Sequence, residues 1–154
     1  NNFYELVNVI VSGSADKTFS YFTAHKNTYP LKKVKSGYAC VLDGDMKTIR
    51  DSKGNTTYKP QDNLHFLFSN ECPEKFLTRA YLSKHPNVNI EYYLENENPH
   101  YLFQAIIDNS ALNDKNEVFE YCWDILVKTD KGILYFKSLQ KFLVDMAEKY
   151  SPEL

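Results

Sequence analysis

The sequence predicts a single α+β domain over residues 1–154, in which a mostly N-terminal antiparallel sheet of hairpins and meander strands is packed by C-terminal helices. Three observations predict this fold class. Short β-prone segments separated by turns fill residues 2–70, and helical periodicity dominates from Pro73 onward. The chain has no internal repeat, no low-complexity tract and no linker long enough to separate two domains.

Residues 3–11 (FYELVNVIV) are rich in β-branched and aromatic side chains. The next residues, SGSADK, have turn chemistry, and residues 18–24 (TFSYFTA) are again β-prone. Two such runs joined by turn-forming residues are typical of a β-hairpin. We therefore expect the chain to begin with two antiparallel strands.

A three-stranded meander is expected over residues 37–59. Residues 37–42 (GYACVL) form its first strand, and the turn DGD at 43–45 leads into MKTIRD. The sequence SKGN at 52–55 is a strong hairpin-turn signal between MKTIRD and TTYKP. Residues 63–69 (NLHFLFS) alternate well enough to add one more strand to the sheet.

The helical part begins at Pro73, because proline suits the first turn of a helix and apolar residues then recur at helical spacing until Pro86 ends the segment. Residues 88–94 (VNIEYYL) alternate as a strand. Asn98 is expected to cap a further helix that starts at Pro99. One strand is thus predicted between two helices.

Two interpretations fit residues 116–128. In the first, the polar residues form one stripe of a helix and the apolar residues lie on its other side. In the second, WDILVK pairs with ILYFK across TDKG as a hairpin. We prefer the helix. After it, Leu139, Phe142 and Met146 define a C-terminal amphipathic helix, with Ser138 as its cap.

Apart from one weak pattern at Asp43 and Asp45, no residue pattern indicates catalysis, a cofactor or a metal centre. The five glycines are scattered and form no phosphate-binding loop, and the four histidines belong to no metal-binding motif. Cys40, Cys72 and Cys122 lack disulfide or zinc spacing, so we expect free, mostly buried thiols in a reducing cytosol. Because the longest apolar stretches are only a few residues long, we expect a cytoplasmic protein that does not enter a membrane.

Charge is distributed unevenly along the chain, whose formal net charge is −2. Residues 1–86 hold 12 Lys and Arg against 8 Asp and Glu, and residues 87–154 hold 6 against 12. This asymmetry predicts two candidate surfaces of opposite charge. The acidic, aromatic one comprises Glu91, Tyr92, Tyr93, Glu95, Glu97, Glu117, Glu120, Trp123 and Asp124. The basic one follows the meander and comprises Lys32, Lys33, Lys35, Lys47, Arg50, Lys53 and Lys59.

The leading hypothesis is a small non-catalytic protein that occludes a macromolecular partner through the acidic, aromatic surface. Carboxylates interleaved with tyrosine and tryptophan resemble the inhibitor side of a complex with a basic protein such as a nuclease. The protein is then of the immunity-protein or phage-encoded inhibitor kind. A composition biased towards amino acids with AT-rich codons suits a phage or mobile-element origin.

Two alternatives come from other functional classes. Lysines interleaved with tyrosines along residues 32–59 suit a nucleic-acid or nucleotide-binding module, since a basic face follows phosphates and tyrosines stack on bases. Asp43 and Asp45, with Lys47 two residues later, form a faint version of a metal-dependent hydrolase or nuclease site. Ordinary turn chemistry explains the same Asp-Gly-Asp sequence without a metal.

Overall fold

The structure is a computed structural model that describes residues 8–32, 37–96 and 98–150. About 60% of the described residues are helical, and these residues contain two short strands that are parallel to each other. The prediction of a mostly antiparallel sheet is therefore wrong. The strand expected at residues 3–11 lies mostly outside the described residues, and its described part, residues 8–11, is irregular.

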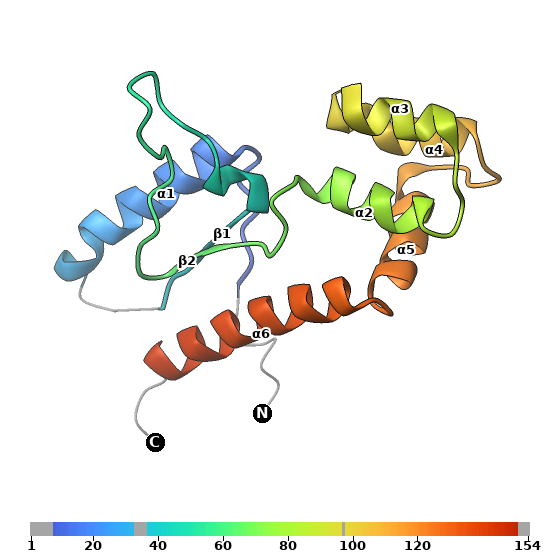
Figure 1. The fold of residues 1–154 in the computed structure, drawn as a ribbon. Coiled ribbons are helices and arrows are strands. Elements are labelled where there is room, and N and C mark those ends of the chain that lie inside the picture. The colour runs from blue at the N-terminus through green and yellow to red at the C-terminus, as the bar shows by residue number, and fades with distance from the viewer. Residues whose placement is uncertain (1–7, 33–36, 97, 151–154) are drawn as a thin grey trace.

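The N-terminal unit consists of α1 (Ala15–Thr28), η2 (Tyr29–Leu31), β1 (Cys40–Leu42), η3 (Gly44–Lys47) and β2 (Leu64–Phe66), where η denotes a 3-10 helix. The two strands pair in parallel and in register along their whole length. α1 packs against β1, and a long loop between η3 and β2 extends away from the strands (Figure 1). This loop makes the crossover that a parallel pair requires.

The helical unit consists of α2 (Pro73–Leu82), α3 (Val88–Asn96), η4 (Pro99–Tyr101), α4 (Leu102–Asp108) and α5 (Lys115–Leu126). α2 contacts α3, α4 and α5, and α4 also contacts both α3 and α5. In Figure 1, α3 and α4 lie side by side above α2, and α5 lies below and behind it. α3 and α5 are therefore on different sides of the helical unit.

Helix α6 (Asp130–Tyr150) runs beneath both units (Figure 1). Its Tyr135 stacks on Phe76 of α2, with ring centroids 5.6 Å apart. Further along the helix, Phe142 stacks on His65 of β2, with centroids 4.9 Å apart. α6 thus joins the two units through one aromatic stack on each.

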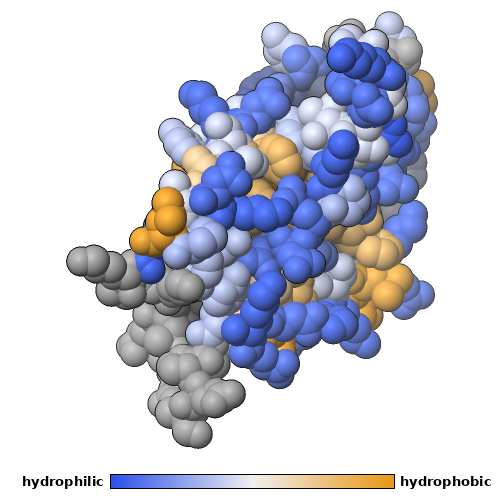
Figure 2. All heavy atoms as spheres, turned by 90° about the vertical axis from the view of Figure 1, so that its left-hand side faces the viewer, coloured by the Kyte–Doolittle hydropathy of each residue, from blue (hydrophilic) through white to orange (hydrophobic). Residues whose placement is uncertain are grey.

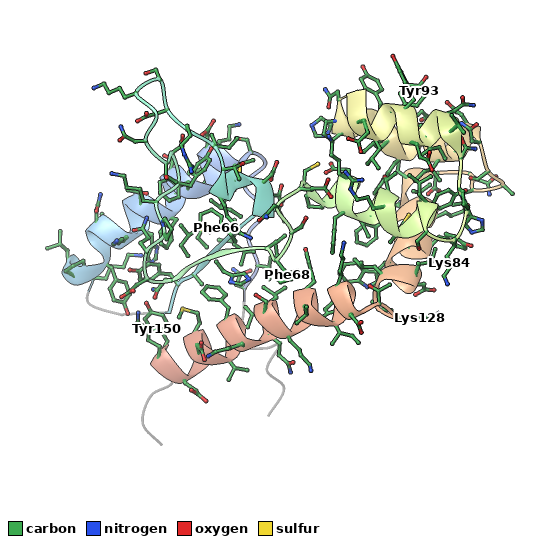
Figure 3. All side chains as sticks on the ribbon, viewed as in Figure 1. Phe66, Phe68, Lys84, Tyr93, Lys128 and Tyr150 are labelled. Atoms are coloured by element: carbon green, nitrogen blue, oxygen red, sulfur yellow. The ribbon has the colours of Figure 1, made fainter. Side chains whose placement is uncertain are left out.

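The C-terminal end of α6 makes a third contact, where Tyr150 lies beneath the N-terminal unit (Figure 3). Its ring centroid is 5.9 Å from that of Tyr38, and its hydroxyl is hydrogen-bonded to the side-chain amide of Asn63. The same amide donates to the carbonyl oxygen of Tyr38 at 3.0 Å, while its oxygen accepts from Lys149 Nζ at 2.7 Å. The buried Asn63 side chain thus bonds α6 through Tyr150 and Lys149 and bonds its own unit through Tyr38.

Each unit has its own hydrophobic core. Among the described residues, the core of the N-terminal unit contains four buried side chains, which are Phe22, Cys40, Leu42 and Tyr58. The core of the helical unit contains ten, which are Phe76, Leu77, Ala80, Tyr81, Ile90, Ala105, Ile106, Val118, Cys122 and Leu126. The larger core draws on every α-helix of its unit, α2 to α5.

Residues 18–24, predicted to form a strand, belong to α1 instead. Ser14 caps this helix, because its hydroxyl oxygen accepts a hydrogen bond from the N–H of Lys17 at 3.3 Å. Phe22 is buried, whereas Tyr21 is 65% exposed. Of the aromatic residues that suggested a strand, Phe22 therefore lies on the buried face of a helix and Tyr21 on its exposed face.

The prediction of a meander over residues 37–59 is also wrong. The turn at 52–55 is present, with Gly54 at a φ of +80°, but its flanks meet only at an isolated antiparallel bridge between Arg50 and Thr56. These flanking residues are mostly exposed. Because no core face holds them, the turn does not extend into a ladder of paired strands.

The strand predicted at residues 63–69 is confirmed in its centre, as β2, but it pairs in parallel with β1. Gly44, directly after β1, lies against the backbone that follows β2. A Cβ atom at this glycine would come within 1.6 Å of the carbonyl oxygen of Ser69. Close backbone packing at this position thus requires glycine.

Residues 88–94, predicted to form a strand, make up most of α3. Asn87 caps this helix, because its Oδ1 accepts a hydrogen bond from the N–H of Ile90 at 3.2 Å. Ile90 and Leu94 are four residues apart and both are buried, whereas Val88 is 80% exposed. A spacing of four satisfies the alternation of a strand and the periodicity of a helix equally, so the sequence pattern was ambiguous.

Three helix predictions are confirmed. α2 begins at Pro73, and Asn98 caps η4, which continues into α4. Most of residues 116–128 lies in α5 rather than in a hairpin. At Pro73 and Asn98 the helix-start residue and the apolar periodicity agree, so local signals were sufficient there.

The cap predicted at Ser138 is wrong, because this residue lies inside α6. The helix begins eight residues earlier, where Thr129 Oγ1 accepts a hydrogen bond from the N–H of Gly132 at 3.0 Å. A Cβ atom at Gly132 would come within 1.9 Å of the carbonyl oxygen of Leu126. The tight turn between α5 and α6 therefore depends on this glycine.

The three cysteines are free, as predicted; Cys40 and Cys122 are buried and Cys72 is half-buried. Burial raises the pKa of Cys40 to about 11 and that of Cys122 to about 12. Both thiols are therefore protonated at neutral pH and behave as small apolar side chains. Within residues 8–32, 37–96 and 98–150, no helix combines the length and the apolar character that crossing a membrane requires.

Candidate interaction surfaces

The described acidic and aromatic residues around α3 form a surface that we call the acidic tyrosine face. It comprises Glu91, Tyr92, Tyr93, Glu95, Tyr101 and Asp108, from α3, η4 and α4, and all six are exposed. Figure 3 shows Tyr93 on the outer edge of the helical unit, remote from the N-terminal unit and from α6. The exposed fractions of the tyrosines are 60% for Tyr92, 38% for Tyr93 and 61% for Tyr101.

A shallow groove of about 260 Å³ crosses this face between α3 and α4. It is lined by Tyr93, Tyr101, Gln104, Ala105 and Asp108, and we call it the tyrosine groove. Gln104 Nε2 donates a hydrogen bond to Oδ1 of Asp108 at 2.9 Å. The groove therefore combines two phenol rings with a carboxylate that a neighbouring side chain holds in place.

A second groove, of about 500 Å³, lies between α2 and α3. Arg79 lines it and forms ion pairs with Glu71 at 2.7 Å and with Glu95 at 3.2 Å. The arginine holds the pKa of Glu71 below its usual range, chiefly by hydrogen bonding. Glu91 and Glu95 line this second groove, whereas Tyr93 and Asp108 line the tyrosine groove, so the acidic tyrosine face spans both grooves. Arg79 neutralises part of the charge of Glu95.

The predicted acidic residues of α5 lie on another side of the molecule. Glu120 and Asp124 are exposed, and so is Glu117, whose carboxylate accepts hydrogen bonds from Asn113 at the start of the helix. Trp123 is half-buried. Its ring meets Phe136 of α6 edge-on, with centroids 4.8 Å apart, and stacks on Phe119 at 5.6 Å.

The structure thus divides the predicted acidic surface into two. α2 and α4 separate the residues of α3 from those of α5, so Trp123 does not join Tyr92 and Tyr93. Glu97 lies outside the described residues.

The predicted basic residues do not line the face of a meander. Lys47 is directed inwards, where its Nζ donates to the carbonyl oxygen of Ser69 at 3.2 Å and desolvation lowers its pKa. Arg50 donates to the carbonyl oxygen of Lys47, while Lys53 occupies the turn of the long loop. Lys59 is exposed further along the same loop.

Lys32 lies at the end of η2, where its Nζ is 3.2 Å from Nδ1 of His25. Lys33 and Lys35 are outside the described residues. Figure 2 views the molecule from the side of the N-terminal unit, and this face is mostly hydrophilic with scattered apolar side chains. The structure therefore offers no continuous basic track for the nucleic-acid hypothesis among the described residues.

Asp43 and Asp45 lie at the start of η3, between the two units. Burial raises the pKa of both carboxyl groups, and the negative charge of Glu74 adds to the effect. Oδ1 of Asp45 is buried and has no hydrogen-bond partner within the described residues. Over the same residues, no group of three or more His, Cys, Asp or Glu side chains has an arrangement able to hold a metal ion.

The tyrosine groove was not predicted from the sequence. A strand at residues 88–94 would have placed Tyr92 and Tyr93 on opposite faces, and nothing singled out Gln104 or Ala105. The available signal was Asn98 followed by Pro99, a helix start that folds α4 back beside α3 and brings Tyr93 close to the following helix. No protein-family model, no curated protein and no solved structure matches this chain.

Proposed function

We propose that this protein binds a basic protein partner through the acidic tyrosine face and occludes part of that partner's surface. The observation that carries the proposal is a groove lined by two exposed tyrosines, Tyr93 and Tyr101, and by the carboxylate of Asp108. Tyr92, also exposed, lies beside it on α3. Tyrosine offers a large, rigid contact area at little cost in conformational entropy, and it is enriched in binding surfaces. Carboxylates at the rim accelerate the encounter with a positively charged partner.

The acidic residues of α5 support this function less well. Glu117 accepts hydrogen bonds from Asn113, and the Trp123 ring is packed between Phe119 and Phe136. These side chains therefore stabilise the helical unit itself. Glu120 and Asp124 are exposed carboxylates on the same helix, and they provide a matched control for the acidic tyrosine face.

Selection of a yeast-displayed random peptide library against the purified protein tests the proposal. We expect the selected peptides to be enriched in arginine and lysine and to bind more weakly as salt is added. Two double variants, Glu91→Gln with Asp108→Asn and Glu120→Gln with Asp124→Asn, each remove two negative charges. The first is expected to raise the peptide dissociation constant about tenfold, and the second less than about twofold.

Two results would contradict the proposal. One is a selected pool without enrichment of basic residues. The other is an equal loss of affinity in the two double variants, because net charge rather than the acidic tyrosine face would then account for binding.

A further inference from the structure

The size of the tyrosine groove matches a single side chain better than a larger ligand. Pockets for small molecules usually enclose about 300–1,000 Å³, and this groove encloses about 260 Å³ and is open to solvent. Ala105, which is 6% exposed, lines it together with the two tyrosines and Asp108.

The side chains that line the groove favour a ligand that is both positively charged and planar. The face of a phenol ring attracts positive charge within about 6 Å, and a guanidinium group stacks on such a ring more readily than an ammonium group does. A guanidinium group also matches a carboxylate with two parallel hydrogen bonds. Tyr93, Tyr101 and Asp108 supply both kinds of partner in one groove.

We infer that the tyrosine groove binds the guanidinium group of an arginine side chain of the partner, against the rings of Tyr93 and Tyr101 and with Asp108 as counter-ion. Gln104 positions the carboxylate through its hydrogen bond to Oδ1 of Asp108. Arginine is also over-represented among the residues that dominate binding energy at protein interfaces. The inference rests on the proposed function, because it names the side chain that the acidic tyrosine face recognises.

Titration of ¹⁵N-labelled protein with N-acetyl-arginine amide, followed by ¹H–¹⁵N spectra at millimolar ligand, tests the inference. N-acetyl-citrulline amide is the matched probe, since it has nearly the same shape without the charge. We expect saturable shifts at Tyr93, Tyr101 and residues 104–108 with the arginine compound and none with the citrulline compound. N-acetyl-lysine amide is expected to bind more weakly than the arginine compound.

Three variants separate the contributions. Tyr93→Phe keeps an aromatic face and is expected to leave the dissociation constant within about twofold, whereas Tyr93→Leu is expected to raise it about two- to fivefold. Asp108→Asn keeps the shape of the side chain but removes its charge. We expect it to raise the dissociation constant at least as much as Tyr93→Leu does. Far-ultraviolet circular dichroism of each variant confirms that the helices remain folded.

The outcomes distinguish the two proposals. If the library yields basic peptides that require Glu91 and Asp108 while the arginine compound shifts no groove residue, the arginine inference is wrong and the proposed function stands. If the arginine compound binds at the groove but no basic peptide is selected, the proposed function fails. Equal shifts with the arginine and citrulline compounds, or tighter binding of the lysine compound, would also overturn the inference.

Discussion

The N-terminal unit and the helical unit are built in different ways. The core of the helical unit contains ten buried side chains from four α-helices that contact one another, whereas the core of the N-terminal unit contains four buried side chains from one helix, a short strand and a loop. The two parallel strands of the N-terminal unit are three residues long each. A sheet of this size is not stable alone in water.

This difference indicates how the two units depend on each other. The helical unit buries more apolar side chains than the N-terminal unit, so we expect it to contribute more of the stability of the chain. The N-terminal unit relies in addition on α6, through the stack of Phe142 on His65 and the contacts of Tyr150 with Tyr38 and Asn63. We therefore expect the N-terminal unit to unfold whenever the helical unit does, but not the reverse.

The largest loss of stability is expected from Ile106→Ala. The Ile106 side chain is 0% exposed, so its truncation leaves a cavity in the helical unit. We predict a loss of about 3–4 kcal/mol in the free energy of unfolding. Urea unfolding followed by the fluorescence of Trp123, the single tryptophan, reports on the helical unit, and circular dichroism reports on both units. Both signals are expected to shift together. A dichroism phase that keeps the parental midpoint would show that the N-terminal unit stays folded without the helical unit.

A smaller and more selective effect is expected from Phe142→Ala, which removes the stack on His65. We predict a loss of about 2 kcal/mol, because Phe142 is only half-buried. The dichroism transition should then precede the transition of Trp123, since the N-terminal unit loses its support first. Val144→Ala, on the same helix and 44% exposed, is the control and should change the stability by less than about 0.5 kcal/mol. Coincident transitions in Phe142→Ala would mean that the units are not separable.

The smallest expected change is in how the free energy of unfolding depends on pH, and it again tests the contact between β2 and α6. Burial and the nearby positive charge of Lys47 lower the pKa of His65, so the folded protein favours the neutral imidazole. Below about pH 6.5 the imidazole of His65 binds a proton more readily in the unfolded chain than in the folded chain. The free energy of unfolding therefore decreases as the pH is lowered. His65→Phe retains an aromatic ring against Phe142 without this titration.

We expect the variant to lose less stability than the parent between pH 7 and pH 5, as measured by urea unfolding at each pH. The raised pKa values of Asp43 and Asp45 act in the opposite direction at acidic pH, because the folded state binds those protons more readily. Both carboxyl groups are present in the parent and in the variant, so their contribution cancels in the difference. If the free energy of unfolding changes equally with pH in the parent and in the variant, protonation of His65 does not weaken its contact with Phe142.

The candidate site was only partly predictable from the sequence. The pairing of carboxylates with tyrosines in residues 91–95 was visible as a pattern, and these residues are exposed. The pattern did not show that these residues are separate from Trp123 and the α5 carboxylates. In the structure, α2 and α4 lie between the two sets. The tyrosine groove requires Tyr93 and Asp108, which are far apart in sequence, to meet across two packed helices.

By itself, the sequence determined the elements whose local signals agree. Pro73 and Asn98 start helices, the polar stripe of α5 defines its exposed side, and the turn at 52–55 forms where glycine permits a positive φ. These features depend on contacts within a few residues along the chain.

Only the tertiary structure decided between helix and strand for residues 18–24 and 88–94, and between parallel and antiparallel pairing for β1 and β2. A spacing of four, as between Ile90 and Leu94, fits both secondary structures, so the core that receives the buried face makes the choice. The physical reason is that most of the stability of a short helix comes from the face it buries, and that face exists only when the other helices are in place.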